Sequence, residues 1–369
     1  MSGSGTKYIT LVLTHQCNLR CRYCYEKHKD NCTMSYDVAK NIIEKELNLL
    51  DKYSIVQIDL FGGEPFLEFD LIKKIVDYSR KCAFKKKFYF FITTNGCLLS
   101  DEIKKWLRDN TDLVQLSLSL DGTKKMQDIN RCNSFDKIDL SFFKTTYPEQ
   151  TVKMTISNET LRNMAEGVIF LHSRGFGVSC NLAYGIDWSD LSNVNALSSQ
   201  LKILIDFYLK NPSIESCSML DVRRLINVSR NSNTNSMVCG VGRGTKAFDY
   251  DGHQYPCQHF LPISIGVKQA RNAAKIKFYS EEIPDYLMDR QCAKCVVRNI
   301  CMTCYGANYA ATGNIFKHDE NMCKLFKIQF KALSYFAIKK FVNHQFDDLG
   351  RIKTASILKS ALMIDKELV

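Results

Sequence analysis

Three cysteines near the start of the chain are spaced closely enough to bind one metal cluster. Cys17, Cys21 and Cys24 form the pattern CxxxCxYC, directly after an apolar run at 8–13. Thiolates are soft ligands that select iron-sulfur clusters, so they can hold three irons of a 4Fe-4S cube and leave the fourth iron open. A zinc site agrees less well with this spacing, because zinc motifs usually combine CxxC pairs with a second pair or with histidines downstream.

This spacing, with an aromatic residue before the third cysteine, resembles the signature of the radical S-adenosylmethionine (SAM) enzymes. In that family the open iron binds the amino and carboxylate groups of SAM, and an electron from the cluster splits SAM to a 5'-deoxyadenosyl radical. The resemblance implies an enzyme with SAM as cofactor and an external one-electron donor of the flavodoxin or ferredoxin type. It also implies that the backbone of Tyr23 lies against the adenine edge.

Two turns after predicted strands resemble further SAM-binding motifs of the family. The first is a GGEP turn made of Gly62, Gly63, Glu64 and Pro65. Glycines allow backbone polar groups to approach a ligand because no Cβ intervenes, and the resemblance implies that this turn binds the amino group of SAM. The second turn contains Asn95 in the sequence Thr-Thr-Asn-Gly. It resembles the family's TNG turn near the ribose.

A third motif follows the fourth predicted strand. Ser119, Asp121 and Gly122 belong to an S-x-D-G pattern, and a short acidic and basic stretch after it ends at Arg131. By the resemblance, Ser119 and Arg131 contact the methionyl carboxylate of SAM. Arginine suits that contact because its planar guanidinium can grip a carboxylate bidentately and stays charged. A solvated surface arginine is the alternative for Arg131.

A second group of cysteines lies far along the chain. Its members are Cys239, Cys257, Cys292, Cys295, Cys301, Cys304 and Cys323. Their spacing resembles the SPASM domain, an extension of radical SAM enzymes that act on peptides and proteins. One departure is that only Met302 and Thr303 separate Cys301 from Cys304, where the family usually has three residues. A zinc ribbon built from the four middle cysteines is the alternative.

The SPASM resemblance implies two auxiliary 4Fe-4S clusters, and thus three clusters in all. Cys239, Cys257 and Cys304 would ligate the first auxiliary cluster, and Cys292, Cys295, Cys301 and Cys323 the second. The first auxiliary cluster then lacks a fourth ligand from the motif. Cys217 is within reach because residues 221–228 read as helical. The preferred expectation is an iron that is open to water or filled by a substrate thiolate.

Composition agrees with an intracellular enzyme that binds clusters. The chain has 369 residues with 45% hydrophobic content, no run long enough to span a bilayer and no signal segment, so we expect a cytoplasmic protein without a membrane partner. A reducing cytosol does not maintain structural disulfides, and the 16 cysteines therefore indicate metal ligands. The net charge of +11 is scattered along the chain, which argues against a nucleic-acid partner.

Short β-rich runs alternate with helical segments over the first half of the chain. Strands are expected at 8–13, 56–60, 87–93, 113–120, 151–156 and 177–183, and helices at 36–50, 70–81, 100–108, 160–173 and 191–209. Six βα units in series indicate parallel strands. They are too few for a closed eight-stranded barrel, so we expect an α/β fold with an open, partial (β/α)6 TIM-like barrel, the core that the resemblance implies.

The expected domain organisation follows from these patterns. Residues 1–5 are a flexible leader, 6–212 the radical SAM partial barrel, 213–345 the C-terminal cysteine-rich iron-sulfur SPASM domain with a packing helix, and 346–369 a C-terminal tail that forms a peripheral helix. The apolar face of the packing helix consists of Phe326, Phe330, Leu333, Ala337 and Phe341.

The preferred function is a peptide maturase that installs a thioether or carbon-carbon crosslink in a ribosomally synthesised (RiPP) precursor peptide. Few residues precede the first strand, so we expect the leader to be recognised by the SPASM surface, the barrel mouth or a separate leader-binding protein. Formylglycine formation by an anaerobic sulfatase-maturing enzyme is the alternative. In our reading that type carries an acid after the second SPASM cysteine, where this chain has Gln258. A non-enzymatic electron carrier is the third hypothesis, and no catalytic acid or base is identified.

Overall fold

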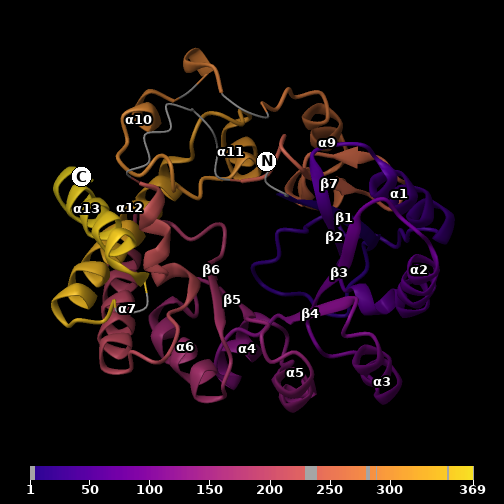
Figure 1. The fold of residues 1–369 in the computed structure, drawn as a ribbon, viewed down its shortest axis with the longest axis horizontal. Coiled ribbons are helices and arrows are strands. Elements are labelled where there is room, and N and C mark those ends of the chain that lie inside the picture. The colour runs from indigo at the N-terminus through magenta and orange to yellow at the C-terminus, as the bar shows by residue number, and fades with distance from the viewer. Residues whose placement is uncertain (1–4, 229–238, 280–282, 288, 347–348, 369) are drawn as a thin grey trace. The chain divides into compact units, whose positions relative to one another are not determined.

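A computed structural model describes residues 5–228, 239–279, 283–287, 289–346 and 349–368 (Figure 1). Its strands are β1 (Gly5–Thr14), β2 (Tyr53–Gly62), β3 (Lys87–Thr94), β4 (Val114–Leu118), β5 (Val152–Ile156), β6 (Val178–Leu182), β7 (Thr245–Phe248) and β8 (Gln254–Tyr255). Its α-helices are α1 (Tyr36–Asn48), α2 (Phe69–Lys81), α3 (Asp101–Asp109), α4 (Lys124–Asn130), α5 (Leu140–Thr146), α6 (Met164–Ser173), α7 (Leu191–Lys210), α8 (Pro262–Ile265), α9 (Val267–Ala273), α10 (Arg290–Ala293), α11 (Tyr305–Thr312), α12 (Glu320–Val342) and α13 (Arg351–Glu367).

The chain divides into two compact units, each described by itself below. The first unit comprises residues 1–120, 127–153 and 240–280, and the second unit comprises 121–126, 154–239 and 281–369. The domain boundaries expected from the sequence stay a prediction. Of the expected leader, residues 1–4 lie outside the described residues, and Gly5 already begins β1.

The first unit is built on a sheet with the strand order β4-β3-β2-β1-β7-β8. Strands β4, β3, β2, β1 and β7 are parallel, and β8 is antiparallel to β7. Ile9, Leu11 and Leu13 of β1 are completely buried, as expected for a central parallel strand covered on both faces. The α/β fold with a parallel sheet is confirmed. Strand β7 was not expected, because it lies within the cysteine-rich segment.

The ends of the parallel strands lie at one edge of this sheet, which positions the loops that follow them. β1, β2, β3 and β4 end at Thr14, Gly62, Thr94 and Leu118. A parallel bridge from Ser119 to Lys153 continues the pairing beyond β4. Helices follow β2 and β3 where the sequence places them, and Ser100 caps α3 by accepting a hydrogen bond from the amide of Ile103.

The second unit has a helical core. Helix α12 packs on α7, where the rings of Tyr208 and Phe336 lie 6.1 Å apart, and on α13, whose Ile357 and Ile364 are completely buried. The expected tail therefore forms a well-packed helix. Phe330, Leu333 and Ala337 are buried as predicted, but Phe341 is 49% exposed. The prediction for Phe341 is wrong because the buried part of α12 ends at Ala337, and Phe341 lies one turn beyond that point.

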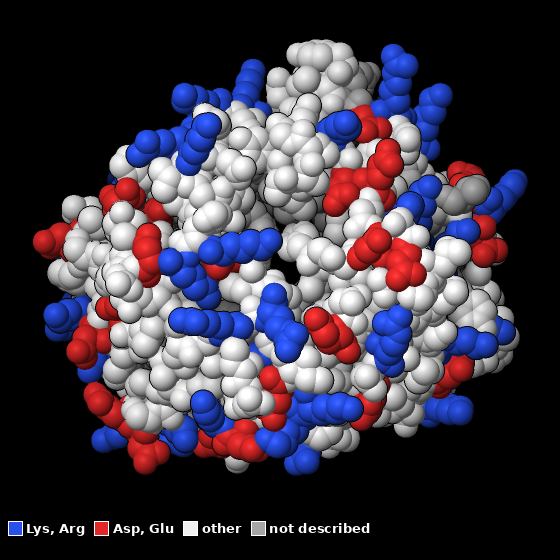
Figure 2. Space-filling model, turned by 180° about the vertical axis from the view of Figure 1, so that it is seen from behind, with Lys and Arg blue, Asp and Glu red and all other residues white. Residues whose placement is uncertain are grey.

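Within the described residues, none of the helices combines the length and apolarity needed to cross a membrane. Figure 2 shows Lys and Arg side chains spread over the face in view, with Asp and Glu side chains among them. On this face the positive charges are thus divided between many separate positions.

Candidate functional site

The cysteine loop of the first unit is held against the GGEP turn by backbone contacts. The amide of Gly63 donates to the carbonyl of Thr14 at 3.0 Å, and the amide of Glu64 donates to the carbonyl of Gln16 at 2.9 Å. A Cβ on Gly63 would lie 2.1 Å from Gln16 O, and Gly62 has a φ of +144°. Both glycines are therefore required by the fold, since no side chain fits between the turn and the chain that leads into Cys17.

The Glu64 carboxylate joins the GGEP turn to the end of β3. It accepts hydrogen bonds from Thr94 Oγ1 at 2.7 Å and from the amide of Asn95 at 2.9 Å. Burial raises the pKa of Glu64, and the hydrogen bonds from Asn95 and Thr94 act in the opposite direction. Its side chain is therefore occupied within the protein, and Glu64 serves as a positioning residue for the two turns.

Asn95 and Ser119 belong to the same cluster of loops. Asn95 Nδ2 donates to Asn18 Oδ1 in the cysteine loop at 2.8 Å, and the amide of Ser119 donates to the carbonyl of Thr94 at 2.8 Å. The structure thus brings the cysteine loop, the GGEP turn, the TNG turn and Ser119 together within the first unit. Asn18 was missed from the sequence because an asparagine between two cysteines carries no separate signal.

Arg131 also lies beside the cysteine loop. Its guanidinium carbon is 5.3 Å from the ring centroid of Tyr23, and the residue is 7% exposed. The amide of Arg22 donates to the carbonyl of Asn130 at 3.0 Å, which ties the loop to the chain before Arg131. The alternative of a solvated surface arginine disagrees with this burial. A buried guanidinium next to the loop is suited to hold a carboxylate.

Glu26 and Lys29 are charged residues near the cysteines that sequence reasoning missed. Burial raises the pKa of Glu26 to about 7, and its Oε1 is buried without a hydrogen-bond partner among the described residues. Burial lowers the pKa of Lys29, but the nearby Cys24 and Cys17 outweigh that effect and raise it. The loop therefore contains a cation next to the thiols.

Four cysteines of the second group line one cavity in the second unit. The cavity has a volume of about 330 Å³, and its cysteines are Cys292, Cys295, Cys301 and Cys323. These are the residues that the SPASM resemblance assigns to the second auxiliary cluster. Burial, followed by the charges of neighbouring groups, raises the pKa of both Cys292 and Cys301 to about 12. Thiols whose ionisation is disfavoured in this way, as at Cys292 and Cys301, fit a bound cationic cluster.

Polar and cationic side chains surround these thiols. Asp289 Oδ2 lies 2.7 Å from His318 Nδ1, and both residues line the cavity. Arg224 Nη2 is buried without a hydrogen-bond partner among the described residues, and its guanidinium lies 5.1 Å from the ring centroid of Phe330. Burial lowers the pKa of Arg224, while Asp221 and Cys301 raise it. Hydrogen-bonding and charged groups around a metal cluster typically orient its ligands and change its reduction potential.

The three cysteines assigned to the first auxiliary cluster are divided between the two units. Cys257 lies in the first unit, whereas Cys239 and Cys304 lie in the second unit. Cys304 precedes α11 and does not line the cavity. Cys217 is completely buried, its amide donates to the hydroxyl of Tyr208 at 2.9 Å, and burial raises the pKa of its thiol. The residues of this cluster stay a prediction.

Residues 11–187 match the model of the Radical SAM superfamily. Uncharacterized protein MJ0907 of Methanocaldococcus jannaschii is 36% identical over 32% of this chain and 40% of its own length. Radical SAM cyclopropyl synthase TigE of Paramaledivibacter caminithermalis is 24% identical over 90% of this chain and 75% of its own. A cysteine-type anaerobic sulfatase-maturating enzyme of Clostridium perfringens is 29% identical over 40% and 43%. The chain thus spans less than half the length of two of these relatives.

Two solved structures share the fold. Native anSMEcpe with bound AdoMet and Cp18Cys peptide aligns with a TM-score of 0.69 at 17% identity, over 93% of this chain and 100% of that chain. Streptococcus suis SuiB bound to precursor peptide SuiA aligns with a TM-score of 0.55 at 15% identity, over 82% and 72%. At these identities the likeness concerns the fold.

Proposed function

We propose that this chain, whose residues 11–187 match the model of the Radical SAM superfamily, is a peptide maturase of that superfamily. It cleaves SAM to a 5'-deoxyadenosyl radical and installs a thioether or carbon-carbon crosslink in a ribosomally synthesised precursor peptide. When bound, the cluster on Cys17, Cys21 and Cys24 supplies the electron that splits SAM. An external one-electron donor of the flavodoxin or ferredoxin type reduces that cluster, and a separate leader-binding protein presents the peptide.

The observation that carries this proposal is the cavity lined by Cys292, Cys295, Cys301 and Cys323. A crosslink forms when two substrate atoms each lose a hydrogen. The radical removes one as a hydrogen atom, the other leaves as a proton, and one electron then remains to be accepted. These four cysteines would hold the second auxiliary 4Fe-4S cluster, which would supply an acceptor for that electron. Cys239, Cys257 and Cys304 would hold the first auxiliary cluster and complete the set of three.

The loops of the first unit hold SAM in this proposal. The backbone of Gly62, Gly63 and Glu64 binds the amino group, Asn95 lies at the ribose, Ser119 and Arg131 hold the carboxylate, and the backbone of Tyr23 meets the adenine. The hydrogen bonds of Glu64 and Asn95 support this assignment, because they fix the loops to one another before a ligand arrives.

The similarity to the sulfatase-maturating enzyme favours formylglycine formation as the second candidate function. Gln258 weakens that candidate, because this neutral side chain occupies the position at which we expect an acid in the sulfatase-maturing type. His259 next to it is half-buried, and desolvation lowers the pKa of its imidazole to about 4. Its imidazole is therefore neutral near pH 7.

Co-expression with each short open reading frame beside the gene tests the proposal. Tandem mass spectrometry should find one peptide that loses a pair of hydrogens and resists fragmentation between the linked residues. The Cys17→Ala/Cys21→Ala/Cys24→Ala variant should leave it unmodified. Formylglycine, recognised by its reactive aldehyde, would instead support the second candidate. The peptide assignment fails if no peptide changes mass or accelerates SAM cleavage.

A further inference from the structure

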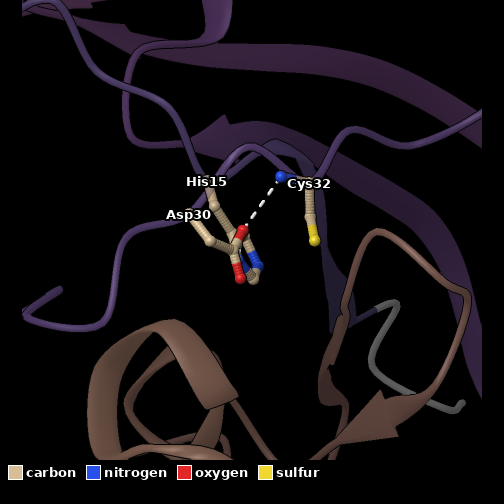
Figure 3. Close-up of side chains that lie close together, drawn as sticks. All are labelled: His15, Asp30 and Cys32. Carbon is tan, nitrogen blue, oxygen red and sulfur yellow. Dashed lines mark hydrogen bonds and ion pairs between the residues drawn. The ribbon is translucent and has the colours of Figure 1, made fainter.

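A histidine, an aspartate and a cysteine converge beside the end of β1, outside the set of cluster cysteines. His15 follows β1, and Asp30 and Cys32 belong to the loop that returns past it (Figure 3). One ligand atom from each of the three residues lies within 4.8 Å of the other two. In Figure 3 the Asp30 carboxylate lies against the His15 ring, and the Cys32 side chain stands beside them.

The two nitrogens of His15 are in different situations. Nε2 lies 2.7 Å from Asp249 Oδ1, a buried hydrogen bond. Nδ1 lies 2.9 Å from Asp30 Oδ1, yet it is buried and makes no hydrogen bond of good geometry within the described part of the chain. If Nε2 donates to Asp249, Nδ1 presents its lone pair to a carboxylate oxygen. That arrangement is repulsive unless a proton or a metal cation lies between the two atoms.

Other contacts orient the His15 ring and the loop that carries Asp30 and Cys32. The ring of Tyr250 packs edge-on against His15 with centroids 5.2 Å apart. The carbonyl of Cys32 accepts from the amide of His15 at 3.0 Å, and the amide of Cys32 donates to Asp30 Oδ1 at 2.9 Å. A histidine whose second nitrogen is bound by a carboxylate, as here by Asp249, is the usual arrangement around protein-bound zinc.

From this geometry we propose that His15 Nδ1, an oxygen of Asp30 and Sγ of Cys32 bind a divalent metal ion of the zinc class, with Asp249 orienting the histidine. Nitrogen, oxygen and sulfur ligands together suit zinc, and three protein ligands leave one position for water. One thiolate and one carboxylate neutralise the dication. Tetrahedral zinc separates neighbouring ligand atoms by roughly 3.3–3.8 Å, and the half-exposed Asp30 side chain, at 54%, has room to adjust.

Zinc K-edge X-ray absorption tests this site, because it detects zinc in the presence of iron. The full chain is first reconstituted with iron and sulfide so that the cluster cysteines are filled, and one equivalent of zinc is then added. We expect about one zinc per chain with one sulfur at ~2.3 Å and lighter ligands at ~2.0–2.2 Å. Zinc with two or more sulfurs, or no retained zinc, overturns the proposal.

Matched variants assign the ligands. In competition with a chromophoric chelator, Cys32→Ser should remove the sulfur shell and weaken zinc binding at least ~10-fold, and Asp249→Asn should weaken it ~10- to 100-fold. Cys82→Ser, which replaces a half-buried cysteine after α2, should change neither measurement. Iron content shows whether Cys32→Ser disturbs the cysteine loop. Asp30→Asn is the independent test, because it retains every thiol and should also weaken zinc binding. Unchanged affinity in Asp30→Asn and Cys32→Ser shows that zinc binds elsewhere and contradicts the proposal.

Discussion

Gly63 lies where any side chain would collide with the backbone that leads into Cys17. A Cβ there would be 2.1 Å from Gln16 O and 2.9 Å from Cys17 Cβ. Gly63→Ala must therefore displace the cysteine loop, and we expect it to lose about four irons per chain together with SAM cleavage. Gly5→Ala is the control, because its Cβ would meet only Tyr53 at 3.5 Å. Full iron content and normal cleavage in Gly63→Ala would show that the loop tolerates the shift.

Arg131 tests the SAM contacts separately from the cluster. Its guanidinium is buried beside Tyr23, so Arg131→Ala removes a charge-assisted, bidentate hydrogen-bond donor. We expect SAM binding to weaken by about 1.5–3 kcal/mol, or ten- to a hundredfold, in equilibrium dialysis. Arg131→Lys keeps the charge without the planar fork, so its SAM affinity should lie between those of the wild-type protein and Arg131→Ala. Iron content should be unchanged, and unaltered SAM affinity in Arg131→Ala would exclude the contact.

The motif residues could be recognised in the sequence because each motif is a short stretch whose residue types and spacing indicate its chemistry. The partners of His15 could not, since Asp249 lies 234 positions away and only the pairing of β7 with β1 brings it near. Glu64 shows the same limit. The sequence marks it as part of a SAM-binding turn, but its hydrogen bonds to Thr94 and Asn95 are tertiary contacts.

At the scale of elements, the loops around α10 and the start of α12 form one cysteine site. We expect the combined variant Cys292→Ala, Cys295→Ala, Cys301→Ala and Cys323→Ala to lose about four irons and to keep the cluster of the first unit, because the cavity that they line lies entirely in the second unit. Iron analysis with electron paramagnetic resonance measures this. Zinc in place of iron in the wild-type protein would favour a zinc ribbon.

Cys217 tests which residues bind the first auxiliary cluster. Its complete burial and the hydrogen bond between its amide and Tyr208 are those of a packed, unreactive thiol. We expect Cys217→Ala to keep all irons and most activity, with the fourth position of that cluster open or filled by the substrate. A cysteine-containing substrate peptide should then perturb the cluster's electron paramagnetic resonance signal, and its serine analogue should not. Loss of about four irons would instead identify Cys217 as the missing ligand.

The strands of the first half were predictable because apolar β-rich runs alternate with capped helices. All six occur, and β3 begins at Lys87 as expected. Strand β7 was missed because Thr245–Phe248 has four residues, which is too short for a pattern, and only its pairing with β1 makes it a strand. Helix α13 likewise depends on tertiary contacts, because its buried Ile357 and Ile364 make it part of the packed second unit.

At the scale of the whole molecule, the account requires two sets of cysteines that do different work. The proposed function assigns SAM cleavage to the set at Cys17, Cys21 and Cys24, and it assigns the surplus electron to the second group. Anaerobically reconstituted protein should therefore contain about twelve irons per chain. A value near four, with zinc present, would contradict the assignment of the second group to clusters.

The release of 5'-deoxyadenosine from SAM under anaerobic, reducing conditions tests the central claim most directly. The wild-type chain should release it, and a precursor peptide should increase the rate. Cys17→Ala/Cys21→Ala/Cys24→Ala should release none while it retains about eight irons, because the second group of cysteines is intact. No release from wild-type protein that holds all its iron, or equal release from the triple variant, would contradict the account.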